Sequence, residues 1–242
     1  MRRGWLAGAL ALAVPNLLQA QSPGPAWISD SRTGCRVWRD DFLNHSASWS
    51  GACVDGTAQG QGVLEWRHAD DSLGARYGGE MNGGKPSGRG VYAWTNGHRY
   101  EGGFRDGKYD GTGAETWPGG TGYTGGYRNG KFTGHGTLVL WDGRRYEGEF
   151  RDGSLYGKGA FTSSTGHRYE GEFNDGKCDG RGVESWSDGR RFAGQYRDGK
   201  PDGYGKYITA RGEVLEGTWD DGKLRQGHGW TTIPDSMKKC GL

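Results

Sequence analysis

The sequence predicts an all-β fold: an elongated, single-layer antiparallel β-hairpin repeat array with about two strands in each 23-residue unit. Three observations support this prediction. An apolar column returns every 23 residues, paired turn residues keep the same period, and apolar and charged residues alternate between the turns. The first column consists of Tyr77, Tyr100, Tyr123, Tyr146, Tyr169, Phe192 and Leu215.

A second apolar column lies four residues after the first, and a glycine separates the two columns in every unit. It consists of Met81, Phe104, Tyr127, Phe150, Phe173, Tyr196 and Trp219. Gly makes up 50 of the 242 residues, a content typical of low-complexity chains. The fixed spacing of the aromatic residues indicates an ordered repeat instead.

Each unit also has two turn pairs. The first pairs are Gly83-Gly84, Asp106-Gly107, Asn129-Gly130, Asp152-Gly153, Asp175-Gly176, Asp198-Gly199 and Asp221-Gly222. The second pairs, which close most units, are Asn96-Gly97, Gly119-Gly120, Asp142-Gly143, Thr165-Gly166 and Asp188-Gly189. Both central residues of a type I′ turn need positive φ, which Asn, Asp and Gly tolerate. Two turns per unit predict two antiparallel strands per unit, joined as a meander.

Segment 146–150 shows the alternation expected of a strand, with two aromatic rings and Gly148 on one face and two glutamates on the other. A two-residue loop would place Gly148 opposite Gly157, and Tyr146 opposite Gly159. Large rings would then face bare backbone. Two two-residue turns would give a repeat with an even number of residues. A repeat of 23 residues therefore cannot bring each ring back to its column with such turns alone. We therefore expect one bulge or odd-length loop per unit, in the glycine-rich stretch after the first turn.

The N-terminus has the pattern of a signal peptide over residues 1–20. Arg2 and Arg3 precede an apolar run from Trp5 to Leu18, and Ala20 precedes the expected cleavage point. A retained N-terminal anchor is the alternative. Export would place the mature chain in an oxidising compartment, where disulfides persist.

Cleavage after Ala20 would leave a mature chain without net charge. Removal of Arg2 and Arg3 reduces the 31 basic residues to 29, which equals the number of acidic residues. Nucleic-acid binding depends on an excess of Lys and Arg, so the sequence indicates no nucleic-acid partner.

The predicted organisation is a lead-in or cap over 21–48, a repeat array over 49–229 and a C-terminal tail over 230–242. The predicted units are 49–76, 77–99, 100–122, 123–145, 146–168, 169–191, 192–214 and a partial unit 215–229. The first is five residues longer than the others and the last is irregular. Atypical end units are typical of caps.

These units resemble the MORN repeat family. Its pattern, Tyr-x-Gly-x-Phe, two residues, Gly-Lys and then Gly-x-Gly, is closely matched at 100–113, 146–159 and 169–182. The resemblance implies a MORN-type meander or solenoid, an elongated twisted sheet with an aromatic groove along one face. It implies no single activity: lipid binding, self-association and scaffolding have been proposed for the module. Where MORN repeats occur in enzymes, catalysis belongs to another domain.

Segments 34–38 and 49–53 resemble the lead-in of exported bacterial MORN proteins. This resemblance implies a disulfide between Cys35 and Cys53 and a location in the periplasm or cell envelope of a bacterium. Two interpretations of the other cysteines stay open. Cys178 pairs with Cys240 if the tail folds back, or it is a buried structural thiol.

The two aromatic columns are the candidate binding site. As an open groove they would bind a partner through Tyr100, Phe104, Tyr123, Tyr127, Tyr146, Phe150, Tyr169 and Phe173. The alternative is that these rings only cover backbone and each other. A basic stripe, Arg76, Arg99, Arg145, Arg168 and Arg191, also precedes the first column. Acidic residues nearby favour a ladder of solvated ion pairs over a row of phosphate sites.

Nothing in the sequence indicates catalysis, a metal site or a cofactor, because the histidines accompany no convincing nucleophile and match no zinc spacing. The predicted function is that of a non-catalytic scaffold of the cell envelope, with a protein partner or self-association through the aromatic groove. The alternative is a module that binds envelope glycan or phospholipid head groups.

Overall fold

The computed structural model describes residues 27–38, 45–226 and 229–232, and this part of the chain contains twenty β-strands. The strands are β1 (Trp27–Ser29), β2 (Arg36–Trp38), β3 (Ser46–Trp49), β4 (Ala52–Val54), β5 (Thr57–Arg67), β6 (Leu73–Asn82), β7 (Lys85–Trp94), β8 (Arg99–Arg105), β9 (Lys108–Thr116), β10 (Gly122–Arg128), β11 (Lys131–Val139), β12 (Arg145–Arg151), β13 (Ser154–Thr162), β14 (Arg168–Asn174), β15 (Lys177–Ser185), β16 (Arg191–Arg197), β17 (Lys200–Ile208), β18 (Val214–Asp220), β19 (Lys223–Gln226) and β20 (Gly229–Thr232).

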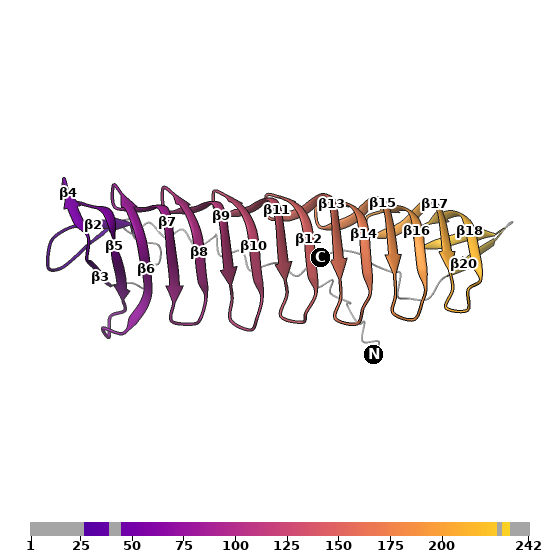
Figure 1. The fold of residues 1–242 in the computed structure, drawn as a ribbon, viewed down its shortest axis with the longest axis horizontal. Coiled ribbons are helices and arrows are strands. Elements are labelled where there is room, and N and C mark those ends of the chain that lie inside the picture. Colours follow the sequence, from indigo (N-terminus) through magenta and orange to yellow (C-terminus); the bar gives the residue numbers. More distant parts are fainter. Residues whose placement is uncertain (1–26, 39–44, 227–228, 233–242) are drawn as a thin grey trace, which may run out of the picture.

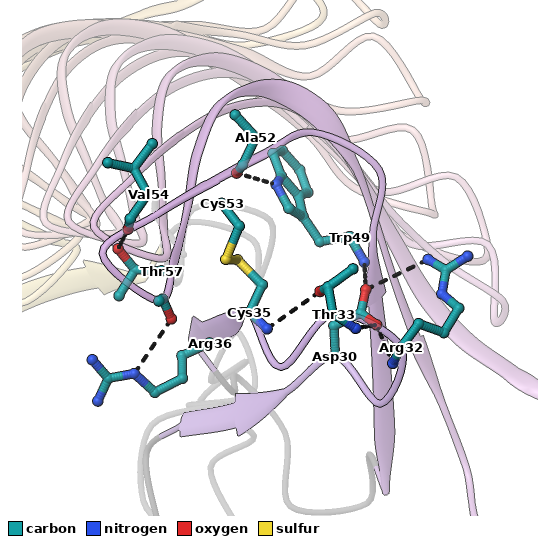
Figure 2. The surroundings of a disulfide bond; sticks show 11 residues. Asp30, Arg32, Thr33, Cys35, Arg36, Trp49, Ala52, Cys53, Val54 and Thr57 are labelled. Atoms are coloured by element: carbon teal, nitrogen blue, oxygen red, sulfur yellow. Dashed lines mark hydrogen bonds and ion pairs between the residues drawn. A yellow bond between two sulfur atoms is a disulfide. The ribbon is translucent and has the colours of Figure 1, made fainter.

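The predicted fold class is confirmed. From β5 to β20 each strand pairs antiparallel with the next, giving one long sheet that does not close. Its strands run across the long axis of the molecule, and the connecting turns form two parallel edges (Figure 1). The array is curved, since successive hairpins trace nested arches when viewed along it (Figure 2).

The two faces of the sheet differ in polarity. Strand β12 alternates strictly between exposed and buried residues, with Tyr146, Gly148 and Phe150 on the buried side and Glu147 and Glu149 on the exposed side. We call these sides the inner and outer faces. The inner face carries the continuous apolar core, which runs from the N-terminal cap to Trp219 and Leu224.

The first turn of each unit has the predicted type I′ geometry. Its Asp or Asn has φ between 48° and 51° in Asp55, Asp106, Asn129, Asp152, Asp175, Asp198 and Asp221. The second turn differs from the prediction. Between Trp94 and His98 the loop has three residues, and of these only Gly97 has positive φ. A type I turn followed by one left-handed glycine joins the strands there, so one glycine is sufficient.

The predicted bulge is confirmed in the glycine-rich stretch after the first turn. Phe150 pairs with Leu155, but Gly148 then pairs with Gly159, because β13 contributes extra residues at the bulge. The predicted pairing of Gly148 with Gly157 is therefore wrong, and Tyr146 lies opposite Phe161 instead of Gly159. Glycine still faces glycine across the hairpin.

The N-terminal lead-in covers the first edge of the array. Strand β2 pairs with β1 and makes one parallel pair with β5, while β3 and β4 both pair antiparallel with β5. The disulfide between Cys35 and Cys53 joins this lead-in to β4, as the resemblance implied (Figure 2). Buried Asp30 accepts the backbone N–H of Trp49 at 2.7 Å.

Several predictions lie outside the described residues, namely the signal peptide over 1–20, most of the tail and the pairing of Cys178 with Cys240. Cys178 itself is fully buried on β15. None of the described residues forms a helix that is long and apolar enough to cross a membrane.

Candidate functional site

The two aromatic columns form a ladder of ring contacts on the inner face, on either side of Tyr146. The Tyr100 ring meets Phe104 of its own unit and Tyr127 of the next unit edge-on, with centroids 5.1 Å apart in both pairs. It also stacks on Tyr109 at 3.6 Å. The contact to the next unit recurs at 5.1–5.2 Å in the pairs Tyr77–Phe104, Tyr123–Phe150, Tyr169–Tyr196 and Phe192–Trp219. Such edge-on pairs stabilise beyond their buried area.

Four of the five tyrosine hydroxyls of the first column have a structural partner. Each donates to the carbonyl three residues later, at the bulge where the ladder of backbone hydrogen bonds is interrupted. The acceptors are Glu80 O for Tyr77 (2.7 Å), Gly103 O for Tyr100 (2.9 Å), Gly126 O for Tyr123 (3.2 Å) and Glu172 O for Tyr169 (3.0 Å). Tyrosine therefore satisfies a backbone acceptor that phenylalanine would leave unpaired.

The repeated glycines provide the space for these rings. A Cβ on Gly102 would lie 2.5 Å from the Tyr100 hydroxyl, and one on Gly113 would meet the same oxygen at 2.5 Å. The ring lies flat over this glycine pair, as predicted. Trp49 lies over Gly51 and Gly62 in the same way, so the longer unit at the start of the array repeats this arrangement.

The prediction of an open aromatic groove needs a correction. Tyr100, Phe104, Tyr123, Tyr127, Tyr146, Phe150, Tyr169 and Phe173 are all between 0% and 6% exposed. The structure brings them together on one face as expected, but it places them in the core. Neighbouring units cover each ring, so the packing interpretation fits these side chains better than the binding one.

Tyr146 interrupts the ladder in the middle of the array. Its unit has Leu155 where the two preceding units have Tyr109 and Phe132, which stack on the first column, and Leu155 packs over Gly148 and Gly159. The Tyr146 ring contacts Phe161 at 4.9 Å instead. Its hydroxyl is buried and has no hydrogen-bond partner among the residues that the structure describes. Burial raises the pKa of Tyr146, although the nearby Arg144 guanidinium opposes this effect.

Two buried glutamates form a constellation that the sequence reasoning missed. Nε2 of His98 lies 2.7 Å from Glu115 Oε1, and the Tyr127 hydroxyl donates to Glu115 Oε2 at 3.0 Å. The same triad recurs 69 residues later, where His167 and Tyr196 contact Glu184 at 2.6 and 2.8 Å. Each triad links three consecutive units.

The sequence does mark these triads, by a glutamate at a position that is apolar in the other units. Glu115 and Glu184 occupy the position that is otherwise Leu64, Tyr92, Leu138, Phe161 and Tyr207. Burial and then the Glu115 carboxylate raise the pKa of Tyr127 far above its ordinary value, and Glu184 adds in the same way to the effect of burial on Tyr196. Both hydroxyls therefore remain protonated donors. The triads are suited to holding units together and not to nucleophilic chemistry.

The triad histidines also belong to an aromatic row along the second-turn edge. The His98 ring stacks between Trp94 at 4.1 Å and Trp117 at 5.6 Å, and His167 stacks on Trp186 at 5.1 Å. The three tryptophans are only half-buried, so part of this row is accessible.

The basic stripe on the outer face forms ion pairs, as favoured from the sequence. Arg99 contacts Glu101 at 2.6 Å, Arg145 contacts Glu147 at 2.9 Å, and Arg168 contacts Glu170. These side chains are about half exposed, so each pair contributes only about 0–1 kcal/mol. In the described part of the chain no cluster of metal-ligating side chains occurs.

Comparison with known proteins gives the family directly. The MORN repeat model matches residues 77–99, 100–122, 123–143, 146–168, 169–190, 192–214 and 216–238, which together are more than half of the chain. This chain belongs to the MORN repeat family. The MORN repeat is generally non-catalytic. The match assigns a seventh repeat to 216–238, where the sequence suggested a partial unit ending at 229.

Two other comparisons add little about function. No curated protein matches the chain. Among solved structures, a mutant of the TCP10 domain of Danio rerio CPAP is similar at 17% identity. The alignment covers 65% of this chain and 84% of that chain, with a TM-score of 0.32.

Proposed function

We propose that this MORN repeat protein is an exported, non-catalytic scaffold of the cell envelope that binds another protein along its second-turn edge. This edge takes the place of the aromatic groove as the proposed binding surface, because the rings of the groove are buried. The observation that carries the proposal is Trp141, which is 71% exposed in the middle of the array. A large apolar side chain held open to solvent is typical of an interaction site, and tryptophan is enriched among residues that dominate binding energy.

The loop that presents Trp141 is held in place on both sides. Leu140 packs against the core, and its N–H donates to Arg144 O at 2.8 Å. The Trp141 N–H donates to Thr121 Oγ1 at 3.1 Å, and Arg144 Nε pairs with Asp142 at 2.7 Å. Because the loop is already ordered, less conformational entropy is lost on binding. Half-buried Trp117 extends the apolar surface along this edge.

The test is photo-crosslinking in intact cells with a photoreactive amino acid at Trp141. We expect a discrete adduct with another protein or a second copy of the chain. The control carries the same group at Tyr156, which is 37% exposed beside the first turn at the opposite edge and should give no such adduct. Equal amounts of protein adduct at both positions would contradict binding that is specific to the second-turn edge. An adduct with lipid or glycan alone would favour the second candidate, a module for envelope glycan or phospholipid head groups.

Self-association is the simplest form of this proposal. A second copy at the Trp141 edge should make the mass in solution depend on concentration, and Trp141→Ala should abolish that dependence. A constant monomer mass would leave only a different protein as partner.

A further inference from the structure

Strand β16 differs in charge from the equivalent strands of the preceding units. On the outer face of β12 and β14, the stripe arginine is followed by two outward glutamates. In β16 the corresponding positions are Ala193 and Gln195. Strand β16 therefore keeps Arg191 of the basic stripe without either acidic residue, whereas β10, which also lacks both, has Gly122 at the arginine position.

The bases around these two positions are retained or added. Lys206 lies directly opposite Ala193, in a column that is otherwise uncharged at Val91, Ala114, Thr137, Ala160 and Val183. Arg181 lies opposite Gln195 on the other side. Arg181, Arg191 and Lys206 are all exposed, and their cationic groups form no ion pair with any described residue. Elsewhere on the outer face, the stripe arginines contact glutamates.

Three acidic residues lie closest to this basic surface. Glu216 lies opposite Lys206 and accepts the Tyr204 hydroxyl at 2.9 Å, and Glu172 accepts the backbone N–H of Arg181 at 2.8 Å. Both donors are neutral, so neither carboxylate is cancelled by its partner. Glu170, on the other side, pairs with Arg168. The three cations therefore exceed the two remaining carboxylates by one charge, which leaves a small local excess of positive charge.

A depression of about 560 Å³ lies within this surface. Its floor is the small or apolar set Gly182, Val183, Ala193 and Gly194, and its rim consists of Arg181, Gln195, Tyr204 and Glu170, the last of which pairs with Arg168. Arg191 and Lys206 lie outside this lining, beside Ala193 in the sheet. Tyr204 is 60% exposed, and its backbone N–H donates to Gln195 Oε1 at 2.9 Å. With its hydroxyl also bonded, the ring is an ordered aromatic surface beside the cations. The volume lies within the range of small-ligand sites, roughly 300–1,000 Å³.

We propose that this basic depression binds an acidic glycan, with carboxylates of the sugar paired to Arg181, Arg191 and Lys206 and a sugar ring against Tyr204. Guanidinium groups match carboxylates in a bidentate geometry, and the aromatic ring favours a cyclic ligand over an isolated anion. The site lies on the outer face, so it does not depend on the protein-binding edge at Trp141. A scaffold with both surfaces could attach its protein partner to an envelope polysaccharide.

The test restores the acidic residue that other units carry. Ala193→Glu places a glutamate where β8, β12 and β14 have Glu101, Glu147 and Glu170, so the fold should tolerate it. The matched control is Thr124→Glu, at the same position of a unit without the basic depression. With tetragalacturonate as probe in low-salt calorimetry, Ala193→Glu should weaken binding roughly tenfold or more, and Thr124→Glu should leave it unchanged.

Comparison probes decide the ligand class. Maltotetraose, which is neutral, and inorganic phosphate should each bind at least about tenfold more weakly than tetragalacturonate. The proposal is overturned if Ala193→Glu binds tetragalacturonate like the unchanged protein, or if either small probe binds as well. It is also overturned if only phosphatidylglycerol vesicles bind in an Ala193-sensitive way, since the occupant would then be a lipid. Crosslinking at Trp141 should be the same in Ala193→Glu, which separates this test from the scaffold proposal.

Discussion

At the scale of single residues, Glu115 and Glu184 show what it takes to place a carboxylate in an apolar column. A buried charge is costly unless it is paired and hydrogen-bonded. In both triads each carboxylate oxygen has its own partner, a histidine on one side and a tyrosine on the other. Because the partners come from three different units, the pairing also fixes how those units sit relative to each other.

The triad should be more sensitive to the loss of one member than to a coordinated replacement. Glu115→Leu leaves His98 and the Tyr127 hydroxyl without their partner, and we expect a loss of about 3 kcal/mol in the free energy of unfolding. Glu115→Leu combined with Tyr127→Phe matches the apolar pair of other units and should recover part of that loss. Urea unfolding measures both variants.

The second triad provides the matched control for this prediction. Glu184→Leu and Glu184→Leu with Tyr196→Phe should show the same order of stability. If the single and double variants lose equal stability at both triads, the hydroxyl contributes nothing and the interpretation fails.

At the scale of the element, the hairpin is organised around its bulge. The bulge interrupts the backbone ladder, the first-column tyrosine donates to the carbonyl exposed there, and the ring covers a pair of glycines. Each of these features depends on the others, since a side chain on either glycine would displace the ring and its hydroxyl. This dependence explains why the glycines recur as strictly as the aromatic residues.

Two adjacent glycines in β6 allow a sharp test. A Cβ at Gly79 would meet the Tyr77 hydroxyl at 2.5 Å and backbone of β7 at 2.7 Å, whereas a Cβ at Gly78 would meet nothing within 4 Å. Neither has positive φ. Gly79→Ala should therefore cost about 1–3 kcal/mol through overpacking. Gly78→Ala should change stability by no more than about 0.5 kcal/mol. Thermal unfolding of both variants is the measurement, and equal losses would contradict the packing of Tyr77 over Gly79.

At the scale of the whole molecule, the aromatic ladder makes neighbouring units depend on each other. Units depend on their neighbours to bury their rings, because the first-column rings other than Tyr146 also contact the second column of the following unit. Stability in such an array is carried by interfaces between neighbours. The interruption at Tyr146 is the place where this contact between rings is replaced by aliphatic packing.

Buried phenols should make the array sensitive to alkali. Tyrosine titrates near pH 10 in an unfolded chain. Burial, with a smaller effect of Glu149, raises the pKa of Tyr123 to about 12 in the folded state. Burial also raises the pKa of Tyr77, Tyr100 and Tyr169. A raised folded pKa gives stability that is complete below about pH 10 and is lost as the pH rises toward the folded value.

We therefore expect unfolding to become easier between about pH 10 and 12. Tyrosinate absorbance from the buried rings should rise together with the loss of near-ultraviolet circular dichroism. Urea-unfolded protein is the control and should titrate at the ordinary value. Full tyrosinate absorbance near pH 10, with the dichroism unchanged, would show that the rings are accessible.

The sequence by itself determined the fold class, the period, the first turn and the presence of a bulge. These features follow from local chemistry: positive φ at Asp-Gly and Asn-Gly, alternation along a strand, and an odd repeat that needs an irregularity. The three-residue second loop meets the odd period, because the bulge adds two residues. The disulfide between Cys35 and Cys53 followed from resemblance and is present in the structure. The aromatic columns were also assigned correctly to one face.

Only the tertiary structure decided what those columns do. The register beyond the bulge, the burial of Tyr100 and its neighbours, and the convergence of His98, Glu115 and Tyr127 all depend on contacts between units. Such contacts join residues 12 to 27 positions apart, and their geometry depends on the bulge and on the curvature of the sheet. Local pattern fixes which face a side chain takes, but the packing of neighbouring units decides whether that side chain can be reached.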